Sequence, residues 1–174
     1  MKILVCGDVH AGKSTLIRRL CADMNDKPRG YITARRECDD GVARVYLYDI
    51  ASPPEKLSDA AVIIELDGEN YKGRPELLDT LGVKYLSGIP EGSLVVLDEI
   101  GTLESKAPEF QRAVMDILSG NFRVLASVKA QNTEFLRAVR SHPDCELYII
   151  TPENRDRLYA QIKKEYGDFK YAID

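Results

Sequence analysis

Residues 7–14 read Gly7-Asp8-Val9-His10-Ala11-Gly12-Lys13-Ser14 and fit the phosphate-binding loop pattern G-x-x-x-x-G-K-[ST]. The apolar, partly β-branched run Lys2–Cys6 precedes this loop and predicts a buried strand. After the loop, apolar residues recur at helical spacing from Lys13 to Met24. Because a strand before the loop and a helix after it are the context that this motif requires, we expect the loop to bind the phosphates of a nucleotide.

The spacing of the loop has a physical reason. Successive backbone N–H groups that point inward beside a helix N-terminus form a site of positive potential that binds anions. Gly7 and Gly12 allow the tight backbone path and the close approach to phosphate oxygens. We expect Lys13 to reach the β- and γ-phosphates and the Ser14 hydroxyl to ligate Mg²⁺. His10 can adopt a positive φ only at some cost, and it either approaches the phosphates or faces solvent.

The composition is typical of a soluble globular protein. The chain has 174 residues, of which 44% are hydrophobic and 30% charged, and we expect one domain over residues 1–174. A net charge of −4 provides no overall attraction to nucleic acid or to an anionic membrane. No apolar run approaches the roughly 18 residues that cross a bilayer. The scattered cysteines form no C-x-x-C pair, and we expect a cytoplasmic protein without a membrane partner; they are Cys6, Cys21, Cys38 and Cys145.

The remaining elements predict an α/β fold with a doubly wound sheet. Three expected strands, Tyr31–Arg35, Val42–Asp49 and Ala61–Leu66, are not separated by helices, so we expect an antiparallel extension of the sheet. The sequence Asp39-Asp40-Gly41 is a hairpin turn signal between the first two. We further expect strands at Leu94–Glu99, Val124–Val128 and Leu147–Ile150, and helices at Pro75–Leu86, Ser105–Leu118, after a Thr133 cap and after a Thr151 cap with Pro152 at the first position.

Asp98 and Glu99 stand at the carboxyl end of an apolar strand. Ligands of open α/β sheets bind at this end of the strands, so both acids are expected beside the phosphate-binding loop. There Asp98 would hold the Mg²⁺ that bridges the β- and γ-phosphates. Glu99 would orient a water molecule in line with the γ-phosphate or take its proton. The alternative is a pair of solvated acids at the end of a strand.

Three further segments connect the chain to a known family. Leu94–Glu104 is similar to the strand-DEIG-x-M-E signature of the small nucleoside triphosphatases that are called cancer-related in vertebrates and also occur in thermophiles. Gly30–Thr33 is similar to the glycine-aromatic-x-threonine strand of that family, and Thr151–Leu158 to its terminal T-x-x-N-R-D-x-L. With the loop at residues 7–14, the resemblance spans nearly the whole chain in the right order.

The resemblance implies a RecA-like fold with a mixed sheet and a Mg²⁺-dependent, slow hydrolysis of nucleoside 5′-triphosphates with little choice among bases. By position it implies catalytic roles for Lys13 and Glu99 and a metal site at Ser14 and Asp98. Near the nucleotide we expect Gly7, Asp8, Val9, His10, Ala11, Gly12, Lys13, Ser14, Thr15, Asn154 and Arg155. Hydrogen bonding at a helix start is the alternative role of Asn154 and Arg155.

The chain departs from the family pattern around the expected site. Val9-His10 replaces proline-glycine in the loop, and Thr102 replaces a basic residue after the DEIG sequence. Phosphoryl transfer needs cations besides Lys13 and Mg²⁺. The candidates are Arg35, Arg36, Arg44 and Lys129, and solvated hairpin charges are the alternative for the arginines. Ser127, near the end of its strand, is a candidate contact of the γ-phosphate or the water.

Two alternative functions stay open from the sequence. In a P-loop kinase, a small-molecule or nucleotide hydroxyl would replace water as the acceptor. In a nucleotide-dependent partner-binding module, hydrolysis would be incidental. Nucleic acid is not an expected partner, because the chain has no basic patch with interleaved aromatic residues.

Overall fold

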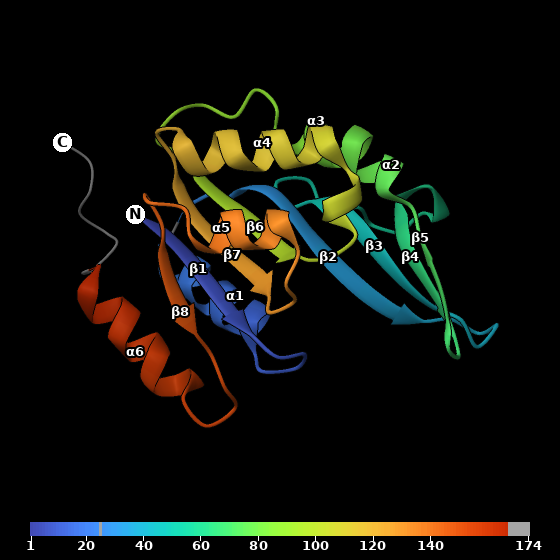
Figure 1. Ribbon diagram of the computed structural model, residues 1–174, viewed down its shortest axis with the longest axis horizontal. Helices are drawn as coiled ribbons and strands as arrows, with labels where there is room; N and C mark the ends of the chain where they lie inside the picture. The colour runs from blue at the N-terminus through green and yellow to red at the C-terminus, as the bar shows by residue number, and fades with distance from the viewer. Residues whose placement is uncertain (25, 167–174) are drawn as a thin grey trace.

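In the computed structural model, which describes residues 1–24 and 26–166, eight strands form one sheet in the order β5-β4-β3-β2-β6-β7-β1-β8 (Figure 1). The strands are β1 Lys2–Gly7, β2 Arg29–Glu37, β3 Ala43–Asp49, β4 Val62–Asp67, β5 Asn70–Gly73, β6 Leu94–Ile100, β7 Arg123–Lys129 and β8 Glu146–Ile149. The helices are α1 Lys13–Met24, α2 Pro75–Leu77, α3 Val83–Leu86, α4 Pro108–Ser119, α5 Glu134–Arg140 and α6 Arg155–Glu165, with short 3₁₀ turns at Asp59–Ala61 and Glu104–Lys106.

The sheet has a parallel part and an antiparallel part. Strands β2, β6, β7, β1 and β8 are parallel neighbours, and β3, β4 and β5 follow β2 through antiparallel pairs. The doubly wound α/β class is therefore confirmed. The expected extension is wrong in one respect: β2 belongs to the parallel part, because α1 carries the chain from β1 across to pair with β6. The hairpin turn is confirmed, with Gly41 at φ 79 between β2 and β3.

The sequence pattern did not reveal strand β5. Its residues Asn70–Gly73 are short, mostly exposed and polar, so they lack the apolar alternation that signals a strand. They pair because a tight turn at Gly68 folds them back onto β4. The expected helix over residues 75–86 is present, but a π-helical segment, Leu78–Gly82, separates α2 from α3.

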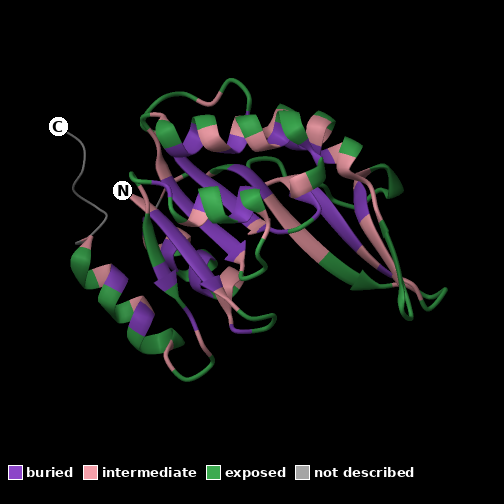
Figure 2. Cartoon of the chain, viewed as in Figure 1, coloured by how far each residue is buried: buried purple, intermediate pink, exposed green. Residues whose placement is uncertain are grey.

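Helices cover both faces of the sheet. Apolar residues of α1 and α6 pack on one face, and those of α2, α3, α4 and α5 pack on the other. The sheet interior is buried, while the outer helix faces and the hairpin tips are exposed (Figure 2). This agrees with the apolar stripe predicted for residues 105–118, where Phe110, Val114 and Leu118 face the core. The α-helix itself begins later than predicted, at Pro108, whose missing N–H is tolerated in a first turn.

The start of α6 differs from the prediction. Thr151 and Pro152 lie in a turn, and the helix begins at Arg155 with Asn154 as its N-cap residue. The Asn154 side chain accepts a hydrogen bond from the Thr151 N–H at 2.8 Å, and the Thr151 hydroxyl accepts one from the Asn154 N–H at 3.3 Å. These reciprocal bonds stabilise a turn in place of the first helical turn.

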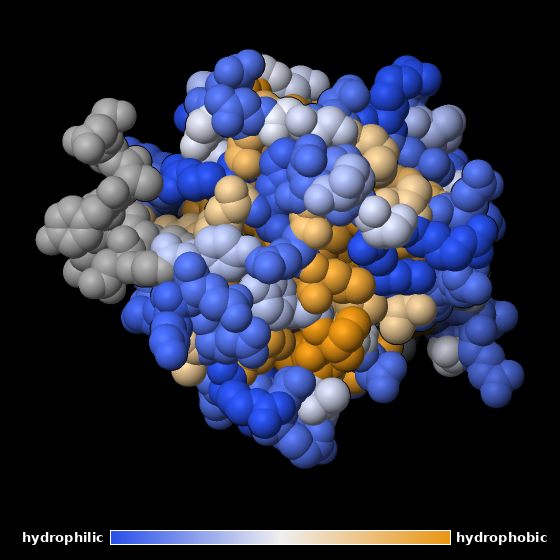
Figure 3. Space-filling view, turned by 60° about the vertical axis from the view of Figure 1, so that its left-hand side comes forward, coloured by the Kyte–Doolittle hydropathy of each residue, from blue (hydrophilic) through white to orange (hydrophobic). Residues whose placement is uncertain are grey.

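One edge of the sheet is partly uncovered. Strand β8 exposes Leu147 and Ile149. An apolar area among hydrophilic residues is visible on this side of the molecule (Figure 3). No helix of the described part is long and apolar enough to cross a membrane.

We expect the core between α4 and the sheet to be sensitive to truncation of Phe110. The ring is fully buried and lies 5.4 Å from the ring of Tyr31 on β2. Phe110→Ala should lower the free energy of unfolding by about 3–5 kcal/mol, because it leaves a cavity. Denaturant unfolding measures this, with the exposed Glu109→Ala on the same helix as the control within about 0.5 kcal/mol. Similar losses in both variants would contradict this packing.

Candidate active site

The phosphate-binding loop connects β1 to α1 at the carboxyl edge of the parallel strands. Gly7 is required by close packing, since a Cβ there would lie 2.4 Å from the Ile150 carbonyl oxygen. Gly12 has φ +101 and His10 has φ 64, so both adopt the left-handed conformation that side chains disfavour. The backbone cost expected at His10 is therefore present, and the histidine also lines the cavity of the site.

Lys13 is held by the loop itself. Its Nζ donates hydrogen bonds to the carbonyl oxygens of Gly7 at 2.8 Å and Asp8 at 2.6 Å. Burial lowers the pKa of Lys13 from its ordinary value, and the nearby Glu99 carboxylate partly offsets that effect. The amine is thus already placed at the mouth of the loop.

Asp98 is the centre of a buried hydrogen-bond junction. The side chain is 2% exposed, and its Oδ1 accepts hydrogen bonds from Ser14 at 2.7 Å and from Ser127 at 2.8 Å. Burial raises the pKa of Asp98, while the two hydroxyl donors lower it. The Ser127 hydroxyl also accepts a hydrogen bond from the Glu99 N–H at 2.6 Å. Ser127 therefore ties the two acids together from the neighbouring strand β7.

Glu99 has an unusual backbone. Its φ is 74, at an irregularity where the pairing of β6 with β7 shifts between Leu97 and Ile100. Such a conformation costs on the order of 1–3 kcal/mol in a residue with a side chain, and it re-aims that side chain. The Glu99 carboxylate accepts a hydrogen bond from the Thr33 hydroxyl at 3.1 Å and lies 3.2 Å from Lys129 Nζ. No local pattern of residues predicts this left-handed backbone.

A third acid lies close behind Glu99. Glu104 is 4% exposed, and its carboxylate accepts a hydrogen bond from the Gly101 N–H at 2.8 Å. Desolvation by burial raises the pKa of Glu104 to about 7. A small cavity of about 50 Å³ reaches both Glu104 and Glu99, with Lys129 in its lining. In the sequence, Glu104 is only the last residue of the family signature, and no local pattern distinguishes this buried carboxyl group from a solvated acid.

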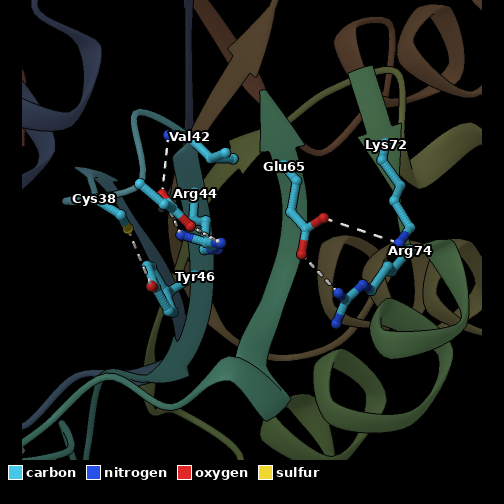
Figure 4. Close-up of polar contacts among 8 residues, drawn as sticks. Cys38, Val42, Arg44, Tyr46, Glu65, Lys72 and Arg74 are labelled. Carbon is cyan, nitrogen blue, oxygen red and sulfur yellow. Dashed lines mark hydrogen bonds and ion pairs between the residues drawn. The ribbon is translucent and has the colours of Figure 1, made fainter. Parts of the chain in front are cut away.

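The loop and the acids share one open cavity of about 570 Å³. Of the candidate cations, Lys129 and Arg35 line it, and Arg36 and Arg44 do not. The Arg44 guanidinium, labelled in Figure 4, pairs with Asp40 at 2.6 Å on the β2–β3 hairpin. Residues that line the cavity and were not proposed from the sequence include Thr33, which stood in the quoted strand motif, and Arg18, which no motif marks.

The two C-terminal candidates for nucleotide binding, Asn154 and Arg155, have different positions relative to the cavities. Arg155 lines a second cavity, of about 300 Å³, together with Gly12 and Thr15 of the loop region. Asn154 does not line either cavity, because its side chain accepts from the Thr151 N–H and donates to the Ile149 carbonyl oxygen at 3.0 Å. The structure thus brings Arg155 to the loop and gives Asn154 hydrogen bonds at the start of α6, the role that the sequence left as its alternative.

The sequence matches the family model described as NTPase over residues 2–163. The chain belongs to the NTPase family. Nucleoside-triphosphatase THEP1 of Methanothermobacter thermautotrophicus is 30% identical over 176 residues, which cover 97% of this chain and 98% of that protein. Nucleoside-triphosphatase THEP1 of Thermotoga maritima is 26% identical over 170 residues, which cover 93% of each chain. The family expected from residues 7–14, 94–104 and 151–158 is confirmed.

Two solved structures have the same fold as this NTPase family member. THEP1 from Aquifex aeolicus superposes with a TM-score of 0.71 at 22% identity, over 93% of this chain and 96% of that chain. The human cancer-related nucleoside triphosphatase superposes with a TM-score of 0.67 at 19% identity, over 95% and 96%. At these identities the likeness concerns the fold alone.

Glu104 should make stability depend on pH. Its carboxyl group has a pKa of about 7 when folded and an ordinary value of 4.5, so the folded protein binds this proton more tightly than the unfolded one. The contribution to stability is present at low pH and is lost as pH rises towards about 7. Glu104→Gln can still accept from Gly101 but does not titrate. Relative to wild type, its free energy of unfolding should rise by roughly 2–3 kcal/mol between about pH 5 and about pH 8.

Denaturant unfolding at the two pH values measures this difference. The exposed Glu109→Gln on α4 is the matched control, and its difference from wild type should be the same at both. A Glu104→Gln variant that follows the pH dependence of the wild type would contradict the assignment of a buried, titrating Glu104.

Proposed function

We propose that the protein hydrolyses nucleoside 5′-triphosphates to the diphosphate and inorganic phosphate in a Mg²⁺-dependent reaction. The observation that carries this proposal is the meeting of Lys13, the Ser14–Asp98 pair and Glu99 in one cavity. They supply an anion-binding cation, two oxygen ligands for a metal and a carboxylate for the attacking water. Membership of the NTPase family supports the same reaction.

The triphosphate would lie across the loop at residues 7–14, with its β- and γ-phosphates on the backbone N–H groups and on Lys13. The Lys13 amine already stands over the loop through Gly7 and Asp8. Phosphate oxygens would replace these carbonyl acceptors. The resulting bonds are stronger because both partners are charged.

The Ser14 hydroxyl and the Asp98 carboxylate fit a Mg²⁺ site. Both are oxygen donors, 2.7 Å apart, at the end of the loop. Mg²⁺ typically takes only one or two protein oxygens and completes its octahedron with waters and phosphate oxygens. When bound, the ion neutralises negative charge on the β- and γ-phosphates. The serines that now donate to Asp98 hold its carboxylate towards the loop.

Glu99 would act on the attacking water. The water oxygen forms a bond to the γ-phosphorus while the bond to the β–γ bridging oxygen breaks, and the diphosphate leaves with that electron pair. The water proton passes to the Glu99 carboxylate and then to the phosphate product. Thr33 and Lys129 orient this carboxylate from both sides, and Ser127 fixes its backbone. These three are positioning residues.

The second cavity would hold the sugar and base. Arg155 lines it beside Thr15 and Gly12, and a guanidinium plane can stack on any base. This supports broad base tolerance. Slow turnover stays a prediction from the family resemblance. The cytoplasmic location and the assignment of all 174 residues to one domain stay predictions.

Glu99→Gln should separate binding from turnover. The amide has the same shape but cannot take a proton, so kcat should fall at least about 100-fold while the dissociation constant for MgATP changes little. Lys13→Ala should instead weaken nucleotide binding itself. Phosphate release and titration calorimetry measure the two effects. An unchanged kcat in Glu99→Gln would disprove the role of that residue.

Hydrolysis should require Mg²⁺ and tolerate all four common bases. ATP, GTP, CTP and UTP should be hydrolysed with kcat/KM values within about tenfold of one another, because stacking on Arg155 does not read base edges. Chelation with EDTA should abolish phosphate release, and added Mg²⁺ should restore it. Undiminished activity in EDTA, or activity on one base only, would overturn the corresponding part of the proposal.

A further inference from the structure

The main cavity extends beyond the phosphate-binding loop and the acids. Its outer wall is formed by β2, β3, β4 and β5, which run past the carboxyl edge of the central strands (Figure 1). The strand residues that line this wall are Thr33, Arg35, Val45, Ile64, Leu66 and Tyr71. We call this surface the outer wall. None of its residues is needed to hold a triphosphate on the loop.

The strand register orders the outer wall from the acids outward. Thr33 contacts Glu99 directly at 3.1 Å. One row further out, Arg35 is paired across the sheet with Val45, and Val45 with Ile64. The next row holds Leu66 paired with Tyr71. A ligand on this wall therefore meets a cation close to the catalytic carboxylate and an apolar, aromatic surface beyond it.

The apolar part of the outer wall is open to solvent. Tyr71 is 54% exposed, and Ile64 and Leu66 are half-buried. Water as a nucleophile needs no such surface. Each Å² of apolar area left exposed to solvent gives up about 25 cal/mol of the stabilisation that burial would provide. Solvent-facing apolar groups beside a few polar ones are typical of small-molecule sites.

Ion pairs of Glu65 support the outer wall from the opposite face of β4. Glu65 alternates with Ile64 and Leu66 and so points to the opposite side of β4. Its carboxylate lies 2.7 Å from Arg74 and 3.9 Å from Lys72, so it ties β4 to β5 and to the start of α2 (Figure 4). The wall is thus held in place without a ligand, which lowers the conformational cost of binding one.

The cation of the wall can take an anionic group. Within residues 1–24 and 26–166, Arg35 bonds only Glu37, and both side chains are more than half exposed, at 56% and 70%. Exposed pairs of this kind contribute little. A guanidinium binds a phosphate through two parallel hydrogen bonds, so a phosphate group can displace Glu37 from Arg35.

We propose that the outer wall binds a second substrate, a ring-bearing phosphate monoester of the nucleoside monophosphate class, with its phosphate beside Arg35 and its ring on Leu66 and Tyr71. Bound in this way, its phosphate oxygen faces the γ-phosphate and takes the γ-phosphoryl group in place of water. This inference rests on the proposed binding of a triphosphate on the loop.

The transfer step balances without a further reactant. An oxygen of the monophosphate forms a bond to the γ-phosphorus, and the bond to the β–γ bridging oxygen breaks. The electron pair of that bond leaves with the first diphosphate, and the acceptor becomes a second diphosphate. A dianionic monophosphate releases no proton, so the step differs from hydrolysis in needing no base. Hydrolysis is then the reaction that occurs when the outer wall is empty.

A binding experiment tests the site. AMP, GMP, CMP and UMP are titrated separately into protein saturated with Mg²⁺ and a non-hydrolysable ATP analogue. At least one should bind at a single site without displacing the analogue. Tyr71→Ala should weaken that binding about tenfold or more through loss of stacking, and Tyr71→Phe should retain it. Ile149→Ala, exposed on β8 outside the cavity, is the matched surface control.

The proposal is overturned if no monophosphate binds the saturated protein, if binding displaces the analogue, or if Tyr71→Ala binds as tightly as Tyr71→Phe. A second experiment follows γ-labelled ATP with the monophosphate that binds. Labelled nucleoside diphosphate should form, and it should fall in Tyr71→Ala purified in parallel, which controls for a contaminating kinase.

The outcomes separate the two proposals. Labelled phosphate without labelled diphosphate would overturn the transfer step and leave the proposed hydrolysis intact. Labelled diphosphate that depends on Tyr71 supports the second-substrate site. If neither product forms, the proposed hydrolysis fails as well, and the titration alone decides whether the outer wall binds a monophosphate.

Discussion

The site depends on one buried carboxylate. Asp98 lies at the end of β6, and it is bonded by a hydroxyl from α1 and another from β7. A buried anion is costly unless it is hydrogen-bonded, so these bonds must form together for the three elements to pack. Ser127 also positions Glu99, because its hydroxyl accepts a hydrogen bond from the Glu99 N–H. The phosphate-binding loop, the metal ligands and the candidate base are therefore positioned by a single junction.

Much of this arrangement is readable in the sequence because its signals are local. The loop at residues 7–14 needs its glycines and lysine at fixed spacing, and the apolar runs beside it need only their own periodicity. The sequence predicts the position of Asp98 and Glu99 beside the loop, because the carboxyl ends of parallel strands meet at one edge of the sheet. This rule applies without knowledge of any tertiary contact. The helix cap at Thr133 was likewise local, and its side chain accepts from the Leu136 N–H.

The parts that the sequence did not reveal are set by contacts between distant segments. The left-handed backbone of Glu99 follows from the pairing of β6 with β7, and its orientation from Thr33 on β2. Glu104 is buried, and the small cavity beside it is lined by Thr33, Ile63 and Tyr71 from distant parts of the chain. Strand β5 forms through antiparallel pairing with β4. Helix α6 begins only at Arg155, because Asn154 bonds Thr151 in the preceding turn. No periodicity or propensity within a short window encodes these features.

The antiparallel strands β3, β4 and β5 extend the sheet on one side of the parallel strands. Their tips at Gly41 and Gly68 have open space around them. The two tips are thus the natural places to insert foreign residues without disturbing the parallel strands. A fluorophore or a short peptide introduced at either tip would give the protein a reporter on the same strands that line the cavity.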